Sequence, residues 1–407
     1  MMVEVFRSDN VVARAVVCED ASRWVVTFDN YSIGHGFDRE GFAQSFLRSN
    51  GISAIHIMGK REDWYQYPEM PDVFSAVKHI LRNADRSITY GSSMGGYAAL
   101  RFADSIGVDA ALALSPQYSI NPARVTFEKR WLQDAERIIW LPEGEPPLPR
   151  RAQAVVVYDP ASIDRMHIDL ISKETEVVSI PVRYSGHPSG SMLAEQQMLS
   201  PLLLDVLSGT VDATKYRRAA RSRRDESVTY LINLSDAAAA KRRDVALRLA
   251  ERAINVQPTH VGALQSLARN LYAQGRNEEA LSAYEKALEI SRLNVVIAVP
   301  YASLLSDLGQ HQPALALARE IASKPETKIM AHIQAWYGFI AQQAGEQVEA
   351  VEAVRRAVVL HPTEETYRKL FKAYQFEASP IGQTRALLTR LRNQLRFRPK
   401  PRQHQSK

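Results

Sequence analysis

The residues of this chain best suited to chemistry lie in the glycine-rich run Tyr90-Gly91-Ser92-Ser93-Met94-Gly95-Gly96-Tyr97. This run matches the pattern G-x-S-x-G, with Ser93 as the central serine. In that pattern a strand enters a turn too tight for bulky neighbours, and a helix begins at once, so the serine hydroxyl is exposed beside a helix N-terminus. The sequence therefore predicts a nucleophilic serine at Ser93, and the alternative is a glycine-rich turn without chemistry.

A serine becomes a strong nucleophile when a histidine takes its proton and an acid holds that histidine. The apolar run 154–158 is typical of a buried strand and is followed directly by Asp159. A second predicted strand, 177–182, leads into a loop of small residues that contains His187. We predict Asp159 as the acid and His187 as the base. Asp164, in the helix expected to follow Asp159, is the reserve acid, and a helix cap at Asp159 or an inert loop histidine is the alternative.

These motifs resemble the α/β-hydrolase superfamily over residues 1–208. The resemblance implies a mostly parallel sheet with helices on both faces. It also implies a nucleophile at Ser93, an acid at Asp159 and a base at His187, acting on an ester, thioester or related acyl bond through an acyl-enzyme. The runs 90–100 and 113–118 also look like bacterial hydrolases that are joined to helical repeats.

The same resemblance implies an oxyanion hole. One donor would be the backbone N–H of Met94, the residue after the nucleophile. The second donor usually comes from the loop after the third strand, which we expect at 24–28, so Asn30 and Tyr31 are the candidates.

Two aromatic segments are expected to shape a substrate pocket. Trp64 and Tyr65 lie in a polar loop after the predicted strand 55–58, and Trp131 lies in the long segment between Ser115 and Arg151. Loops after parallel strands open at the edge of the sheet where the serine lies. We predict substrate contacts for these three side chains, and packing in the core is the alternative.

The second half of the chain carries an internal repeat. Gly275, Gly309 and Gly345 recur at intervals of 34 and 36 residues, and Ala280, Ala314 and Ala350 keep the same spacing. A period of 34 with small residues at the helix crossings is typical of tetratricopeptide repeats, which bind protein partners. We therefore predict an interaction module without catalytic residues over 236–376, and a generic helical bundle is the alternative.

Basic residues are concentrated in two further segments of the chain. Six basic residues crowd the stretch 215–224, and residues 378–407 carry eight Lys or Arg and no Asp or Glu. The predicted organisation is a hydrolase domain over 1–208, a basic linker over 209–235, the repeats over 236–376 and a basic tail over 377–407. Basic and apolar residues alternate in the tail in a way that fits an amphipathic helix in weak contact with an anionic surface, and a solvated tail is the alternative.

Composition favours a protein of the cytoplasm without a cofactor. The chain has one cysteine, Cys18, which excludes an internal disulfide framework and a cysteine-based zinc site, so we expect no metal. Neither a secretory signal nor a membrane-spanning run is visible, and no nucleic-acid motif is present.

Three functions remain open at this stage. The first is a serine hydrolase that acts on a small-molecule or glycan acyl substrate and is brought to a protein partner by the repeats. The second is an acyltransferase that modifies a bacterial glycan with the same triad. The third is a non-catalytic repeat scaffold with a relic hydrolase domain.

Overall fold

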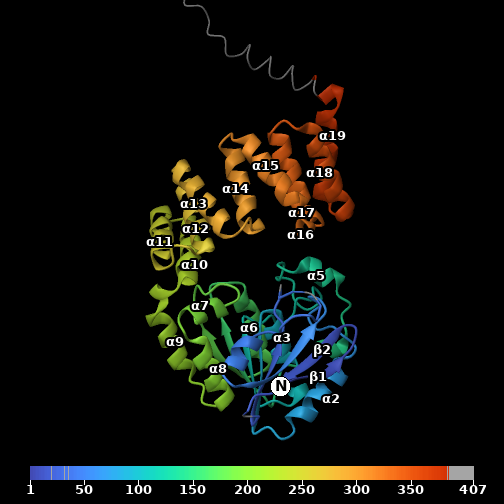
Figure 1. Ribbon diagram of the computed structural model, residues 1–407, viewed down its shortest axis with the longest axis vertical. Coiled ribbons are helices and arrows are strands. Elements are labelled where there is room, and N and C mark those ends of the chain that lie inside the picture. The colour runs from blue at the N-terminus through green and yellow to red at the C-terminus, as the bar shows by residue number, and fades with distance from the viewer. Residues whose placement is uncertain (20, 32, 35, 383, 385–407) are drawn as a thin grey trace, which may run out of the picture. The chain divides into compact units, whose positions relative to one another are not determined.

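The computed structural model describes residues 1–407 except 20, 32, 35, 383 and 385–407 (Figure 1). The chain divides into two compact units, the first spanning Met1–Pro258 and the second beginning at Thr259. The first unit is built on a sheet, whereas the described part of the second is all helical.

The first unit contains an eight-stranded sheet in the order β1-β2-β4-β3-β5-β6-β7-β8. β2 pairs antiparallel with β1 and β4, and the pairs from β4 through β3 to β8 are parallel. The inner strands are mostly apolar and are buried on both faces, as is typical of parallel sheets. The strands are β1 Met2–Arg7, β2 Val11–Val16, β3 Arg23–Phe28, β4 Ser53–Gly59, β5 Arg86–Ser92, β6 Ala110–Leu114, β7 Gln153–Tyr158 and β8 Val177–Pro181.

Helices cover this sheet on both faces. Alternate strand residues such as Val26, Ile55 and Ala111 join one core cluster with the buried residues of α2, α3 and α6. The residues between them face the other side, where α8 packs on β3, β5 and β6. The helices up to α8 are α1 Gln44–Ser49, α2 Met70–Leu81, α3 Met94–Arg101, α4 Ala103–Ile106, α5 Leu132–Arg137, α6 Asp164–Glu174, α7 Gly190–Glu195 and α8 Leu199–Ser208, with a short 3-10 helix η1 at Pro142–Gly144.

The segment predicted as a solvated linker is folded. It forms α9 Ala213–Ser222, the 3-10 turn η2 Arg224–Glu226 and the start of α10 Val228–Ala239, which pairs with α11 Arg243–Val256. Tyr216 and Ala220 are buried, and Asn233 donates a hydrogen bond to the carbonyl of Tyr184. The basic residues misled the prediction because they lie on the exposed face of an amphipathic helix, whose other face packs against β8.

The second unit stacks helix pairs. The pairs are α12 Val261–Tyr272 with α13 Asn277–Ile290, α14 Val295–Asp307 with α15 His311–Ser323, and α17 Ala331–Gln343 with α18 Gln347–Leu360; α16 Pro325–Lys328 and α19 Glu365–Ala378 complete the described helices. The turn between the two helices of each pair contains a glycine with positive φ. These glycines are Gly275, Gly309 and Gly345. At Gly338 a Cβ would lie 2.5 Å from Val354, so only glycine lets α17 approach α18 this closely. The predicted mostly parallel sheet with helices, followed by an all-helical repeat region, is confirmed.

Within the described residues, no helix combines the length and the apolar character needed to cross a membrane. The predicted amphipathic helix of the basic tail involves Arg385 and the residues after it, which lie outside the described residues.

Candidate active site

The residues of the candidate site all follow the carboxyl ends of neighbouring parallel strands. Ser93 follows β5, Gln117 follows β6, Asp159 and Asp164 follow β7, and His187 follows β8. Because β5 to β8 are consecutive in the sheet, these ends meet at one edge. The site is therefore assembled from four loops on a rigid scaffold.

The turn at Ser93 has the strained backbone of a nucleophile elbow. Ser93 adopts φ 55° and ψ −117°, a conformation that a residue with a side chain rarely takes. A Cβ on Gly91 would lie 2.1 Å from the carbonyl oxygen of Gly95, and a Cβ on Gly95 would lie 2.4 Å from that of Phe28. Both glycines are thus required by close backbone approach, and α3 begins directly at Met94.

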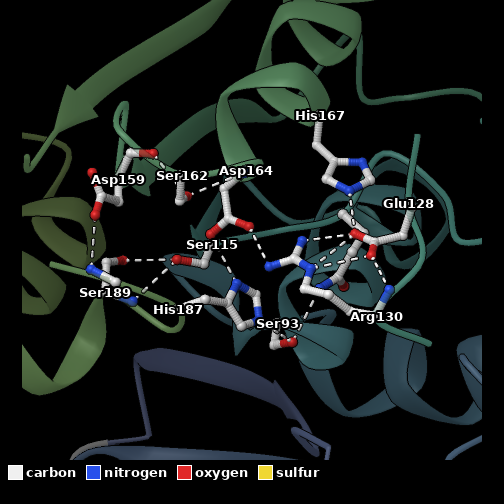
Figure 2. A network of polar contacts seen from close by, with 12 residues as sticks. Ser93, Ser115, Glu128, Arg130, Asp159, Ser162, Asp164, His167, His187 and Ser189 are labelled. Atoms are coloured by element: carbon white, nitrogen blue, oxygen red, sulfur yellow. Dashed lines mark hydrogen bonds and ion pairs between the residues drawn. The ribbon is translucent and has the colours of Figure 1, made fainter. Parts of the chain in front are cut away.

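His187 links the serine to a buried carboxylate (Figure 2). The hydroxyl Oγ of Ser93 lies 2.8 Å from Nε2 of His187, and Nδ1 of His187 lies 2.8 Å from Oδ2 of Asp164. With Nδ1–H donating to the carboxylate, Nε2 is free to accept the serine proton. Ser93 is 5% exposed and Asp164 is 1% exposed, so the pair of contacts is shielded from bulk water.

The predicted pairing of Asp159 with His187 is wrong, because Asp164 occupies that position. The carboxylate of Asp159 accepts hydrogen bonds from the backbone N–H groups of Ala161 at 2.8 Å, Tyr184 at 3.0 Å and Gly186 at 2.9 Å. It therefore ties the end of β7 to the loop that carries His187. Asp164 begins α6, five residues further along, and its side chain turns toward the histidine.

A charged network that the sequence did not reveal lies beside Asp164, on the side of Arg130 and Glu128 (Figure 2). Arg130 forms an ion pair with Asp164, with Nη1 2.9 Å from Oδ1, and binds Glu128 with two of its nitrogens at 2.7 and 3.1 Å. Nδ1 of His167 accepts from the N–H of Tyr118, so Nε2 carries the hydrogen and donates to Glu128 at 2.8 Å.

The network fixes the charge of Glu128. Burial alone would raise its pKa, but the hydrogen bonds from His167 and Arg130 outweigh burial and lower the pKa to about 2. Glu128 is therefore a carboxylate at neutral pH, and Arg130 lies between the side chains of Glu128 and Asp164. Asp164 and His167 are one turn apart on α6, so both point to the segment that contains Glu128 and Arg130.

Gln117 is a further site residue that the sequence analysis missed. Its Nε2 donates to Oγ of Ser93 at 3.0 Å, and the side chain is 2% exposed. The serine oxygen thus accepts one hydrogen bond while its own hydrogen points to His187. The position of Gln117 just beyond β6 was the available signal, since side chains at that edge of a parallel sheet converge on the site.

The predicted oxyanion donors lie close together. Met94 is the first residue of α3, where the backbone N–H has no acceptor within the helix. Met94 and Asn30 line the same shallow recess. The N–H of Asp29 is bonded to the hydroxyl of Tyr65, so the next amides along the loop, those of Asn30 and Tyr31, remain the candidates for the second donor.

The three predicted substrate-binding aromatics differ in position. Tyr65 is 1% exposed, and its hydroxyl donates to the carbonyl of Ile57, so it is a core residue and the prediction of a substrate contact is wrong. Trp64 is also fully buried, with its ring 5.8 Å from those of Tyr31 and Trp131. Only the ring of Trp131 reaches the site, 5.3 Å from that of His187.

The side chain of Tyr31 packs against the rings of Trp64 and Trp131. Its hydroxyl donates to Asp134 at 3.1 Å, and burial together with the charge of Asp134 raises its pKa to about 12. The phenol therefore stays protonated, and a contribution of this residue to an oxyanion hole would come from its backbone N–H.

Comparisons with known proteins found a family model and several similar solved structures. A family model described as a tetratrico peptide repeat matches residues 263–377. Similar solved structures include MamA 41-end from Desulfovibrio magneticus RS-1, at 16% identity and TM-score 0.34, covering 42% of this chain and 97% of that one. A structure titled for the functional characterization of Pseudomonas aeruginosa pilF matches at 17% identity and TM-score 0.34, covering 38% of this chain and 70% of that one.

No curated protein matches the sequence. The spacing of the glycines, the helix pairs and the family match agree on one conclusion. The C-terminal half of the chain contains tetratricopeptide repeats, which bind protein partners.

Proposed function

We propose that the first unit is a serine hydrolase that cleaves an ester, thioester or related acyl bond through an acyl-enzyme. The proposal rests on two contacts of 2.8 Å. One joins Oγ of Ser93 to Nε2 of His187, and the other joins Nδ1 of His187 to Oδ2 of Asp164. The strained turn at Ser93 and the order Ser, Asp, His along the chain agree with the resemblance to α/β-hydrolases.

The roles follow from the geometry. Oγ of Ser93 attacks the acyl carbon while Nε2 of His187 takes the hydroxyl proton, and Asp164 stabilises the imidazolium that forms. The negative oxygen of the tetrahedral intermediate is stabilised by the N–H of Met94 and by an N–H from the loop of Asn30 and Tyr31. His187 then protonates the leaving group, and the acyl-enzyme is released when water attacks with His187 as the base.

Arg130 and Glu128 support this arrangement. The ion pair with Arg130 holds the buried side chain of Asp164 in place beside Nδ1 of His187. The repeats would then direct the hydrolase to a protein partner, because the stacked helices of such repeats form binding surfaces for other chains.

The test is turnover of a small activated ester, p-nitrophenyl acetate, by the full-length protein. Ser93→Ala is expected to lower kcat on the order of 10⁴-fold or more, because the nucleophile is lost. Ser92→Ala is the matched control: it makes the same chemical change one residue away, on a side chain that is also 5% exposed. Equal turnover in the two variants would contradict the proposal.

A further inference from the structure

Another concave site of the first unit lies at the end of β8, which is an edge strand of the sheet. It is a cavity of about 500 Å³ lined by residues of β8, α7, α9, η2 and α10. This volume lies within the range of small-molecule sites in proteins. Its most distinctive feature is charge, since four arginines line it: Arg183, Arg217, Arg221 and Arg224.

None of the four arginines is neutralised by an acidic side chain within the described residues. Arg217 donates only to the carbonyl of Ala213 and the hydroxyl of Thr214, and Arg183 lies over the ring of Tyr184. The acidic residues nearest in sequence, Asp225 and Glu226, form ion pairs with Arg252 and Arg223 instead. A cavity lined by charges of one sign concentrates counterions, so the site attracts anions.

The floor of the cavity is apolar. Val182 and Met192 line it together with Tyr184 and Tyr230, whose rings are 6.0 Å apart in an edge-to-face arrangement. A ligand that fits both parts has an anionic end for the arginines and a flat or apolar end for the floor.

We propose that this cavity binds a soluble phosphate-bearing small molecule of about nucleotide size. Guanidinium groups match phosphate oxygens with paired hydrogen bonds, and four of them exceed what a single carboxylate can use. The volume of about 500 Å³ is suited to one small molecule rather than to a nucleic acid helix. The assignment is independent of the chemistry at Ser93.

The experiment measures binding of ADP, pyrophosphate and adenosine to the full-length protein by isothermal titration calorimetry. ADP and pyrophosphate are expected to bind, and adenosine is expected to bind more weakly than ADP because it lacks the phosphates. Arg221→Glu should weaken ADP binding on the order of 100-fold, since it removes one charge-assisted contact and adds a repulsive charge.

Arg218→Glu is the matched control. Arg218 is exposed on the same helix α9 but does not line the cavity, and the change in net charge is identical. It should leave the dissociation constant for ADP within about threefold of the wild-type value, with circular dichroism showing that both variants are folded.

Three outcomes would overturn the proposal. One is the absence of binding by both ADP and pyrophosphate. Another is equal weakening by the two variants, which would indicate a diffuse basic surface. The third is binding to vesicles that contain phosphatidylinositol phosphates without binding to the soluble phosphates, which would make the site a membrane contact.

Discussion

At the scale of single residues, two aspartates five positions apart make different contacts: one with the side chain of His187 and the other with the backbone of its loop. Asp164 faces Nδ1 of His187, whereas Asp159 accepts three backbone N–H groups and holds the loop that carries the histidine. Both carboxylates are buried and lie at the carboxyl end of β7. In the proposed mechanism, only Asp164 can stabilise the imidazolium of His187.

This division predicts unequal effects of the same substitution. Asp164→Asn should lower kcat for an activated ester on the order of 10⁴-fold, because the amide favours the wrong tautomer of His187. Asp159→Asn keeps the shape of the side chain and should cost much less activity, with its main effect on thermal stability. Steady-state kinetics of both variants check this, and a greater loss of kcat in Asp159→Asn would contradict the assignment.

The sequence predicted that Ser93 and His187 meet, as they do in the structure, but paired the histidine with Asp159 instead of Asp164. Ser93 is recognisable because the glycines around it are required by backbone geometry, and His187 lies in a loop of small residues after a strand. The choice between Asp159 and Asp164 depends on the direction of two side chains after β7, which local sequence does not determine. Arg130 and Gln117 come from a long connection, and only tertiary structure brings them to the site.

At the scale of elements, β4 carries a buried histidine that links stability to pH. Nδ1 of His56 contacts the hydroxyl of Thr27 at 2.6 Å, and Nε2 has no hydrogen-bond partner among the described residues. Burial lowers the pKa of His56 from 6.5 to about 4. The imidazole is thus neutral within the folded sheet.

The direction of the pH effect follows from that shift. Between pH 6.5 and about 4 the unfolded chain binds a proton that the folded chain does not, so acidification favours unfolding. We expect this histidine to remove about 3 kcal/mol of the free energy of unfolding across that interval. His56→Gln should reduce the pH dependence measured by urea denaturation, whereas His79→Gln, on an exposed face of α2, should leave it unchanged. Identical pH profiles for all three proteins would contradict this explanation.

The elements themselves were largely predictable. Apolar runs in the sequence predicted the strands that lead into the site. The period of 34 residues predicted the repeats, because each pair of helices needs the same small residues at its crossing. The basic segment after α8 was misjudged, since six charges in ten residues conceal the buried Tyr216 and Ala220 of an amphipathic helix.

At the scale of the whole molecule, the site residues all belong to the unit that ends at Pro258. That unit includes α9 to α11: α9 packs against β8, α10 packs against α7, and α11 packs against α10. Glu195 accepts hydrogen bonds from Ser227 and Thr229, and Gln196 donates to the carbonyl of Ala220. The boundary of the first folded unit is therefore expected after Pro258 rather than at 208.

Two truncations test this boundary. A chain that ends after Pro258 should remain folded and keep most of its turnover of a small activated ester. A chain that ends after Ser208 lacks the helices that cover β8, so it should expose apolar surface and melt at a lower temperature or aggregate. If the chain that ends after Pro258 is inactive while the full-length protein is active on the same ester, the repeats belong to the active unit.

The central claim is that His187 activates Ser93, and labelling by a fluorophosphonate tests it without knowledge of the substrate. The wild-type protein is expected to take up the probe on the peptide that contains Ser93, and Ser92→Ala is expected to be labelled to the same extent. Ser93→Ala and His187→Ala should abolish labelling while both proteins remain folded. Labelling that persists in Ser93→Ala, or an unlabelled wild-type protein, would contradict the account.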